Sequence, residues 1–187
     1  MPKLKHIITT LVALGGAGLL IVVLAKGLKM DQSKIPSALL NKPAMPFDVA
    51  WIQGKEFMKS QNETNFRIED IIGKPAVLNF WASWCVSCRE EARDLERYWQ
   101  SYAKSHGILV VGIAIQDTMD AAKGFAETYG KTYILGLDTD GKAAINYGVT
   151  GVPETFFIDA KGKIIHKEVG PVSTELLESL SQKLLSH

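Results

Sequence analysis

The fold is decided by the stretch AVLNFWASWCVSC at residues 76–88, an apolar run of strand type that ends in two cysteines. A charged segment whose apolar residues recur at helical spacing begins directly after it. Cys85 therefore falls at a helix N-terminus, where free N–H groups and the helix dipole favour a thiolate. Cys88 follows about one turn later, close enough to form a disulfide with Cys85. The pattern predicts a dithiol redox centre.

Two other roles for these cysteines are open at this point. A structural zinc site needs four ligands, and none of the four histidines of the chain lies near Cys88 in the sequence. A purely structural disulfide across so short a loop removes little entropy from the unfolded chain. The spacing therefore favours redox chemistry over a metal site or a structural crosslink.

The other apolar patterns predict strands that alternate with helices. The continuous apolar run at 108–115 is typical of a parallel strand covered on both faces. Residues 62–65 read as a polar loop and residues 68–72 as a short helical turn. Further strands are expected at 47–52, 133–137, 155–158 and 163–166, and helices after Cys88, from Asp117 or Thr118 to Tyr129, at 141–147 and after Ser173. This order predicts an α/β fold with helices packed on a mixed sheet.

The N-terminal region is the second informative part of the chain. Residues 7–25 carry no charge and are numerous enough to cross a bilayer as one helix. A cleaved signal peptide is the alternative, but its apolar core is usually only about 7–15 residues long. We therefore expect a short N-terminus (1–6), a transmembrane anchor (7–25), a tether (26–46) and one domain (47–187).

The charge composition bears on the kind of partner. The chain has 21 Lys and Arg against 20 Asp and Glu, which gives a formal net charge of +1. The charges are mixed along the chain, with no basic stripe or arginine-rich segment. A nucleic-acid partner is therefore not expected.

Two longer motifs narrow the assignment to a family. They are GKPAVLNFWASWC at 73–85 and YGVTGVPET at 147–155, and the segments 35–44 and 169–171 add to them. With these motifs the chain resembles the thioredoxin superfamily. Within it, the chain is similar to the membrane-anchored, reducing branch used in cytochrome c maturation (DsbE/CcmG-like, with ResA- and TlpA-like relatives). The resemblance covers roughly residues 35–185 and implies a thioredoxin fold.

The resemblance also implies roles for individual residues. Cys85 is expected to be the exposed nucleophile that attacks a substrate disulfide, and Cys88 to resolve the mixed disulfide. Pro153 is expected to be cis and to face the dithiol. Val152 would then offer backbone hydrogen bonds to the substrate, and Trp84 would shape the surface that the substrate contacts.

Three polar residues are expected to tune the pKa of the dithiol. Asn79 stands where thioredoxin has a buried aspartate, and an asparagine cannot accept a proton. The reducing branch places carboxylates elsewhere, at positions that match Glu91 and Glu154, although each could instead be a solvated surface charge. A carboxylate near Cys85 raises the cysteine pKa and removes a stabiliser of the reduced state. Such a site is predicted to be reducing.

The expected function is that of a thiol:disulfide oxidoreductase with no cofactor beyond its own Cys85–Cys88 pair. It would reduce disulfides of apocytochrome c, or of another client, and be recharged by a membrane electron donor of the DsbD/CcdA type. The resemblance places it in the inner membrane as a single-pass protein, with residues 1–6 cytoplasmic and the catalytic domain periplasmic or otherwise extracytoplasmic. The alternatives are a general extracytoplasmic reductase or oxidant, and an apocytochrome-binding module with a secondary redox role. A copper-delivery protein of related fold would need a different cysteine spacing and a nearby histidine.

Overall fold

The computed structural model describes residues 2–28, 38–58 and 62–185. The chain divides into two units, Met1–Ile35 and Pro36–His187. Each unit is described by itself below.

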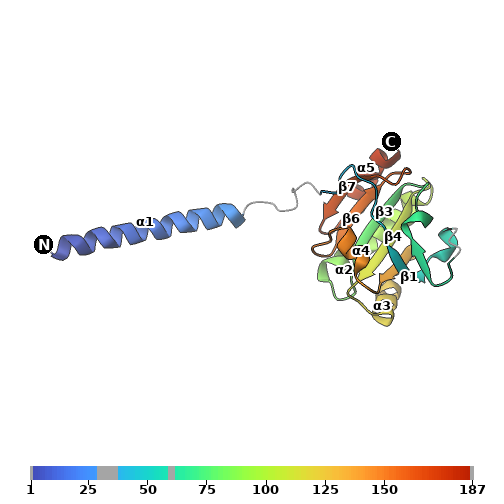
Figure 1. The fold of residues 1–187 in the computed structure, drawn as a ribbon, viewed down its shortest axis with the longest axis horizontal. Coiled ribbons are helices and arrows are strands. Elements are labelled where there is room, and N and C mark those ends of the chain that lie inside the picture. The colour runs from blue at the N-terminus through green and yellow to red at the C-terminus, as the bar shows by residue number, and fades with distance from the viewer. Residues whose placement is uncertain (1, 29–37, 59–61, 186–187) are drawn as a thin grey trace. The chain divides into compact units, whose positions relative to one another are not determined.

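The first unit consists of one helix, α1 (Pro2–Leu28), which is 27 residues long (Figure 1). Its described apolar side chains, among them Leu11 and Leu19, are exposed. In the described part of the chain, no helix combines the length and the apolar character needed to cross a membrane. The anchor predicted for residues 7–25 is therefore not confirmed.

The second unit is built on one seven-stranded sheet with the strand order β2-β1-β5-β4-β3-β6-β7 (Figure 1). The strands are β1 (Asp48–Gln53), β2 (Asn65–Arg67), β3 (Ala76–Trp81), β4 (Leu109–Ile115), β5 (Ile134–Asp138), β6 (Glu154–Ile158) and β7 (Ile164–Val169). The interior strand β3 is parallel to β4 and antiparallel to β6, and every residue of β3 and β4 is buried. The predicted mixed sheet and thioredoxin-like α/β fold are confirmed.

One prediction about the strands is wrong. Residues 62–65 are not entirely a polar loop, because Asn65 begins β2 and pairs with Ala50 of β1. The pairing stabilises this short strand, and only its central residue Phe66 is buried. Three residues, of which only Phe66 is apolar, are too few for local alternation to reveal a strand.

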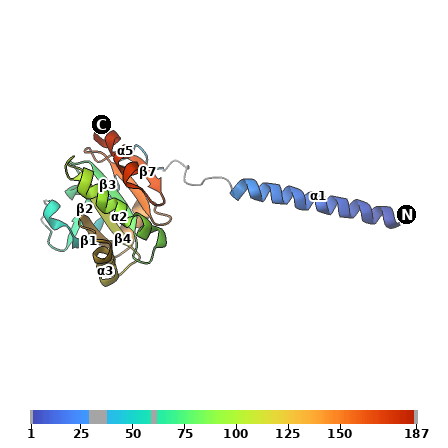
Figure 2. The same cartoon turned by 180° about the vertical axis from the view of Figure 1, so that it is seen from behind.

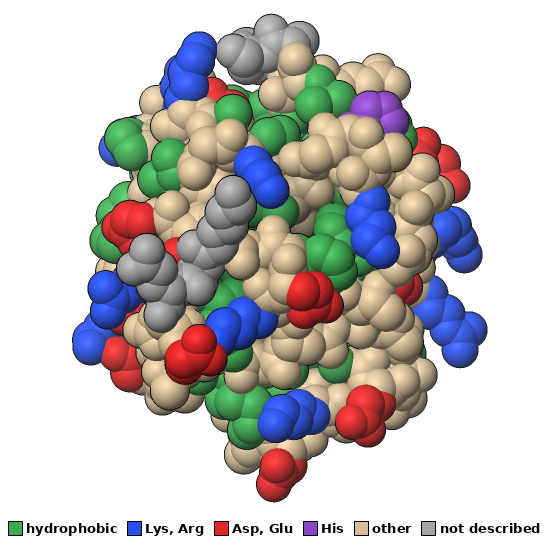
Figure 3. Space-filling view, turned by 90° about the vertical axis from the view of Figure 1, so that its right-hand side faces the viewer, with side chains coloured by type: hydrophobic (Ala, Val, Ile, Leu, Met, Phe, Trp, Pro, Cys, Tyr) green, Lys and Arg blue, Asp and Glu red, His purple; other side chains and the backbone are tan. Residues whose placement is uncertain are grey.

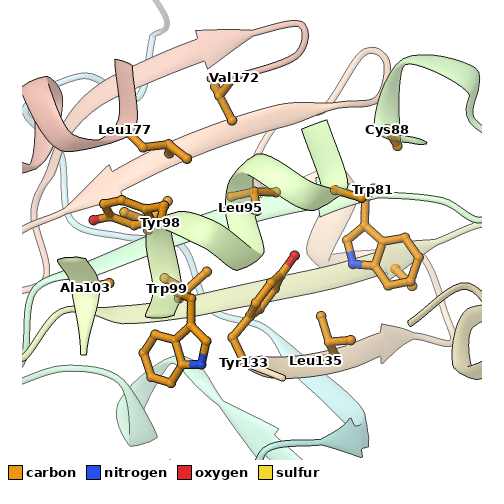
Figure 4. Close-up of a cluster of buried hydrophobic side chains, with 14 of the residues drawn as sticks. Trp81, Cys88, Leu95, Tyr98, Trp99, Ala103, Tyr133, Leu135, Val172 and Leu177 are labelled. Atoms are coloured by element: carbon orange, nitrogen blue, oxygen red, sulfur yellow. The ribbon is translucent and has the colours of Figure 1, made fainter. Parts of the chain in front are cut away.

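Helices cover both faces of the sheet. They are α2 (Val86–Tyr98), α3 (Met119–Tyr129), α4 (Lys142–Asn146) and α5 (Thr174–Leu185), with single turns η2 (Lys55–Phe57) and η3 (Ile68–Asp70) and a π-helical turn η4 (Trp99–Ala103). Figure 2 shows α2 and α3 on one side of the sheet, while Figure 1 shows α4 on the other. The core between α2, α3, α5 and the sheet contains Trp81, Leu95 and Leu177, which are labelled in Figure 4.

The helix boundaries follow the signals in the sequence. Thr118 caps α3 by accepting a hydrogen bond from the Ala121 N–H, and Gly130 ends the helix with φ 64°. Because φ is positive there, glycine suits the position better than residues with a side chain. Ser173 precedes α5, and its hydroxyl oxygen accepts a hydrogen bond from the Leu176 N–H. These predictions are confirmed.

The segment predicted as a tether (26–46) is only partly described, because residues 29–37 lie outside the described residues. Its C-terminal part is hydrogen-bonded to the β6–β7 hairpin: Asn41 N–H donates to the Ile164 carbonyl, and Ala44 N–H to the Gly162 carbonyl. The end of the predicted tether is therefore part of the second unit.

The surface of the second unit carries charges of both signs. Figure 3 shows lysine and arginine side chains interspersed with aspartate and glutamate on one face, with small apolar areas between them. This mixture agrees with the formal net charge of +1.

Candidate active site

The two cysteines lie where β3 passes into α2. Cys85 is the N-cap residue of α2, and its Sγ accepts a hydrogen bond from the Cys88 N–H over 3.0 Å. The two sulfurs form a disulfide, with 5.3 Å between the Cα atoms. A sulfur in this position receives the N–H groups and partial positive charge of the helix end, which stabilise a thiolate after reduction.

The turn between β4 and α3 holds the residues just before Cys85. Asp117 accepts hydrogen bonds from the Ser83 backbone N–H (2.6 Å) and from the Ser83 hydroxyl (2.9 Å). The Trp84 indole N–H donates to the carbonyl of Gln116 over 3.0 Å. Gln116 has φ 49°, an uncommon value for a residue other than glycine. The hydrogen bonds from the β4–α3 turn thus fix the loop that presents the first cysteine.

The cis-proline loop lies on another side of Cys85. The Val152–Pro153 peptide bond is cis, as predicted, and the Val152 carbonyl oxygen is 3.4 Å from Cys85 Sγ. In the disulfide the sulfur has no proton, whereas a reduced Cys85 thiol can donate a hydrogen bond to this oxygen. The Pro153 carbonyl accepts from the Gly170 N–H, which attaches the loop to the end of β7.

Accessibility differs among the residues around the disulfide. Cys85 is 5% exposed and Cys88 is 1% exposed, so the expectation that Cys85 is exposed is wrong for this oxidised form. The cause is its position between the helix end and the Val152 carbonyl. Trp84 and Val86, on either side of Cys85 in the sequence, are 54% and 66% exposed. An apolar surface therefore adjoins the reactive sulfur.

Asn79 and Glu91 form a buried polar pair between β3 and α2. The Asn79 amide donates to one Glu91 carboxylate oxygen (2.8 Å) and to the Thr155 hydroxyl (3.0 Å), and the Val172 N–H donates to the other oxygen of Glu91 (3.1 Å). Burial raises the pKa of Glu91 to about 7, although the hydrogen bonds from Asn79 and Val172 act in the opposite direction. Glu91 lies three residues after Cys88, on the same side of α2. An acid with this pKa can give or take a proton near neutral pH.

Glu154 is also buried, but its surroundings differ. One carboxylate oxygen accepts hydrogen bonds from the Thr150 N–H and hydroxyl, and the other lies 2.7 Å from the Lys167 ammonium nitrogen. The ion pair offsets the negative charge of Glu154 and weakens any repulsion of a thiolate. Neither Glu91 nor Glu154 is a solvated surface charge.

One charged residue near the site was missed by the sequence analysis. Lys131 is buried, and its Nζ lies 3.8 Å from the centre of the Trp81 ring. Burial lowers the pKa of Lys131 to about 7. In the sequence it follows Gly130, a helix stop, and reads as an ordinary surface lysine. No local signal distinguishes it.

The fold and the dithiol together define a thiol:disulfide oxidoreductase of the thioredoxin-like class. Residues 33–184 match the Redoxin family. The thiol:disulfide interchange protein DsbE of Allochromatium vinosum is 41% identical over 167 residues, covering 89% of this chain and 86% of that protein. The chain belongs to the Redoxin family and, within it, to the DsbE-type thiol:disulfide interchange proteins.

Other comparisons agree with this assignment. The thiol:disulfide interchange protein HelX of Rhodobacter capsulatus is 38% identical over 115 residues, which cover 61% of this chain and 62% of HelX. Among solved structures, a thiol:disulfide interchange protein of the thioredoxin family from Chlorobium tepidum TLS is 29% identical, with a TM-score of 0.63. The similarity covers 76% of this chain and 95% of that one.

Proposed function

We propose that this protein reduces disulfides of apocytochrome c during cytochrome c maturation. The observation that carries the proposal is the Cys85–Cys88 pair at the start of α2, held against the cis Val152–Pro153 loop. The similarity to DsbE and HelX proteins adds the biological setting. An apocytochrome segment with two oxidised cysteines would lie along the Val152 backbone and the exposed Trp84 side chain.

The proposed reaction begins with the reduced protein. The Cys85 thiolate attacks one sulfur of the client disulfide; a mixed disulfide forms, and the other client sulfur leaves as a thiolate. Cys88 then loses its proton to the Glu91 carboxylate, and its sulfur attacks Cys85 Sγ. The bond between Cys85 and the client breaks, and the second client sulfur leaves as a thiolate. Two electrons have passed to the client, and the Cys85–Cys88 disulfide remains.

The direction of electron flow follows from the balance of charges at the site. The N-terminus of α2 stabilises a thiolate on Cys85, whereas an ionised Glu91 destabilises it. Glu154 contributes less, because Lys167 offsets its charge. We infer that Glu91 is the main residue that makes the dithiol reducing. A membrane donor of the DsbD/CcdA type would return the disulfide to the dithiol.

A functional test uses cells that lack their own DsbE-type reductase. The wild-type protein should restore covalent haem attachment to cytochrome c in these cells. The variant with both Cys85→Ser and Cys88→Ser should fail, although it is present at the same level. Restoration by the double serine variant would instead identify the protein as an apocytochrome-binding module.

We also propose that residues 7–25 anchor the protein in the inner membrane, with the catalytic domain on the periplasmic side. The support is the uncharged sequence of this span and the exposed apolar side chains of α1. After a carbonate wash, the full-length protein should stay with the membranes. A released form that begins at Lys26 would show that the span is a cleaved signal peptide.

A further inference from the structure

A buried positive charge lies on the face of the sheet that α2 covers. Lys131 follows the end of α3, and its ammonium nitrogen lies 3.8 Å from the centre of the Trp81 ring. Trp81 is the last residue of β3, four positions before Cys85, and is completely buried. A buried ammonium is costly unless an opposite charge compensates it. The position of Lys131 therefore calls for an acidic partner.

Of the carboxylates that act on Lys131, Glu91 has the largest effect. Its attraction raises the pKa of Lys131, and the attraction of Lys131 lowers the pKa of Glu91. Asn79 and Trp81 are two positions apart on β3 and therefore face the same side of the sheet. Asn79 is hydrogen-bonded to Glu91, and the Trp81 ring lies against the Lys131 ammonium group. Glu91 and Lys131 thus belong to one buried cluster, which α2 and the α3–β5 segment supply.

Other groups face this cluster from the same elements. Asp94 of α2 raises the pKa of Glu91, and Glu96 of α2 raises the pKa of Lys131. Tyr133, just before β5, has its pKa raised by burial and by Glu91 and Glu96, so its hydroxyl stays neutral. Figure 4 shows this hydroxyl directed toward α2.

Several polar atoms of the cluster are unsatisfied. Among the described residues, Asn79 Oδ1, Trp81 Nε1 and the Tyr133 hydroxyl are buried without a hydrogen-bond partner. Native proteins contain only a few such groups for each hundred residues. Three such atoms, together with the Glu91 carboxylate and the Lys131 ammonium group, make the interior beside α2 polar.

We propose that Lys131 is a positioning residue for disulfide reduction, which acts through Glu91 by keeping that carboxylate ionised and able to accept the proton of Cys88. The inference rests on the proposed reductase function. The proton moves from Cys88 Sγ to the Glu91 carboxylate while the Cys88–Cys85 bond forms and the Cys85–client bond breaks. The client sulfur leaves with the electron pair. Lys131 forms no bond in this step; its charge balances Glu91 before the proton arrives.

The test replaces Lys131 by methionine, which has a similar length and no charge, in the full-length protein. The pKa of Glu91 is read from the ¹³C signal of its carboxyl group, assigned as the glutamate signal that disappears in Glu91→Gln. A nearby opposite charge lowers a carboxyl pKa by about 1–3 units, so Lys131→Met should raise the pKa of Glu91 by about 1 unit or more. The ionised fraction of Glu91 at pH 7 then falls from about one half to about one tenth, so reduction of a disulfide peptide at pH 7 should slow by about fivefold or more and recover at higher pH.

Two further variants separate this role from a structural one. Lys104→Met removes an exposed lysine that lies 5.2 Å from another tryptophan, Trp99, and should leave the Glu91 pKa and the pH profile unchanged. The double variant Glu91→Gln/Lys131→Met should show the same pH profile as Glu91→Gln alone, because Lys131 then has no carboxylate to act through. A further change in the double variant would contradict the inference.

An unchanged pKa of Glu91 in Lys131→Met would overturn the inference directly. If that variant does not fold, the ¹³Cε signal of Lys131 supplies the measurement: it should titrate at a lower pH in Glu91→Gln than in the wild-type protein, because the attraction of Glu91 raises the pKa of Lys131. An unchanged titration of Lys131 in Glu91→Gln would also overturn the inference. Both signals are read without a client. A wild-type protein that shows the coupled titration but reduces no client would refute the proposed function and leave the buried pair intact.

Discussion

Replacing Glu91 by glutamine should change the stability of the protein in a direction that depends on pH. Burial raises the pKa of Glu91 from 4.5 to about 7, so the carboxyl group of Glu91 binds its proton more tightly in the folded protein than in the unfolded chain. The stability from this effect is fully present below pH 4.5 and is lost as the pH rises through about 7. At about 1.4 kcal/mol for each pKa unit, the loss amounts to about 3 kcal/mol.

Glutamine does not titrate, but it loses one hydrogen bond. Its carbonyl oxygen can still accept from Asn79, whereas its NH₂ group cannot accept from the Val172 N–H. The lost bond costs about 1 kcal/mol at every pH. Glu91→Gln should therefore be about 1 kcal/mol less stable than wild type at about pH 4, and about 2 kcal/mol more stable at about pH 8.5.

The assay is urea unfolding of the oxidised full-length protein, followed by tryptophan fluorescence at several pH values between these limits. The two stability curves should cross as Glu91 ionises. Glu90→Gln is the matched control, because Glu90 is the exposed neighbour on the same helix and should give parallel curves. A constant difference between wild type and Glu91→Gln over the whole pH range would refute the raised pKa.

Two further predictions concern the residues that hold the site. Lys167→Met leaves the buried Glu154 without its counter-charge and should destabilise the protein by about 3–5 kcal/mol in urea unfolding. Lys163→Met, which replaces an exposed lysine, is the control and should change the stability little. Equal small effects of the two variants would show that the ion pair is unimportant. Asp117→Ala removes both hydrogen bonds to Ser83 and should cost about 1–3 kcal/mol while slowing client reduction, and unchanged kinetics would mean that the β4–α3 turn does not position the first cysteine.

Local patterns were enough to predict most of the fold. The buried strand at 76–81 and the continuous run at 108–115 could be recognised because central parallel strands are apolar on both faces. The ends of α3 followed from Thr118 and Gly130, since capping and left-handed conformations depend on residue type. The short strand β2 (Asn65–Arg67) could not be predicted, because its stability comes from pairing with β1.

The site was predictable only in part. The position of the cysteine pair followed from the junction of strand and helix, and the cis bond before Pro153 followed from the family motif. The environments of Glu91 and Lys131 could not be predicted, because they depend on burial and on an interaction between residues forty positions apart. The sequence around a lysine that follows a helix-ending glycine does not reveal whether its ammonium group is solvated or packed against a tryptophan ring.

The central claim is that Cys85 attacks the client and Cys88 resolves the mixed disulfide. The most direct measurement is to trap mixed disulfides in cells with single serine variants, followed by non-reducing gels and identification of the captured clients. Cys88→Ser should accumulate mixed disulfides, with apocytochrome c among them, because Cys85 can still attack but the bond cannot be resolved. Cys85→Ser should trap few or none. Equal trapping by the two variants would contradict the assignment of the two sulfurs.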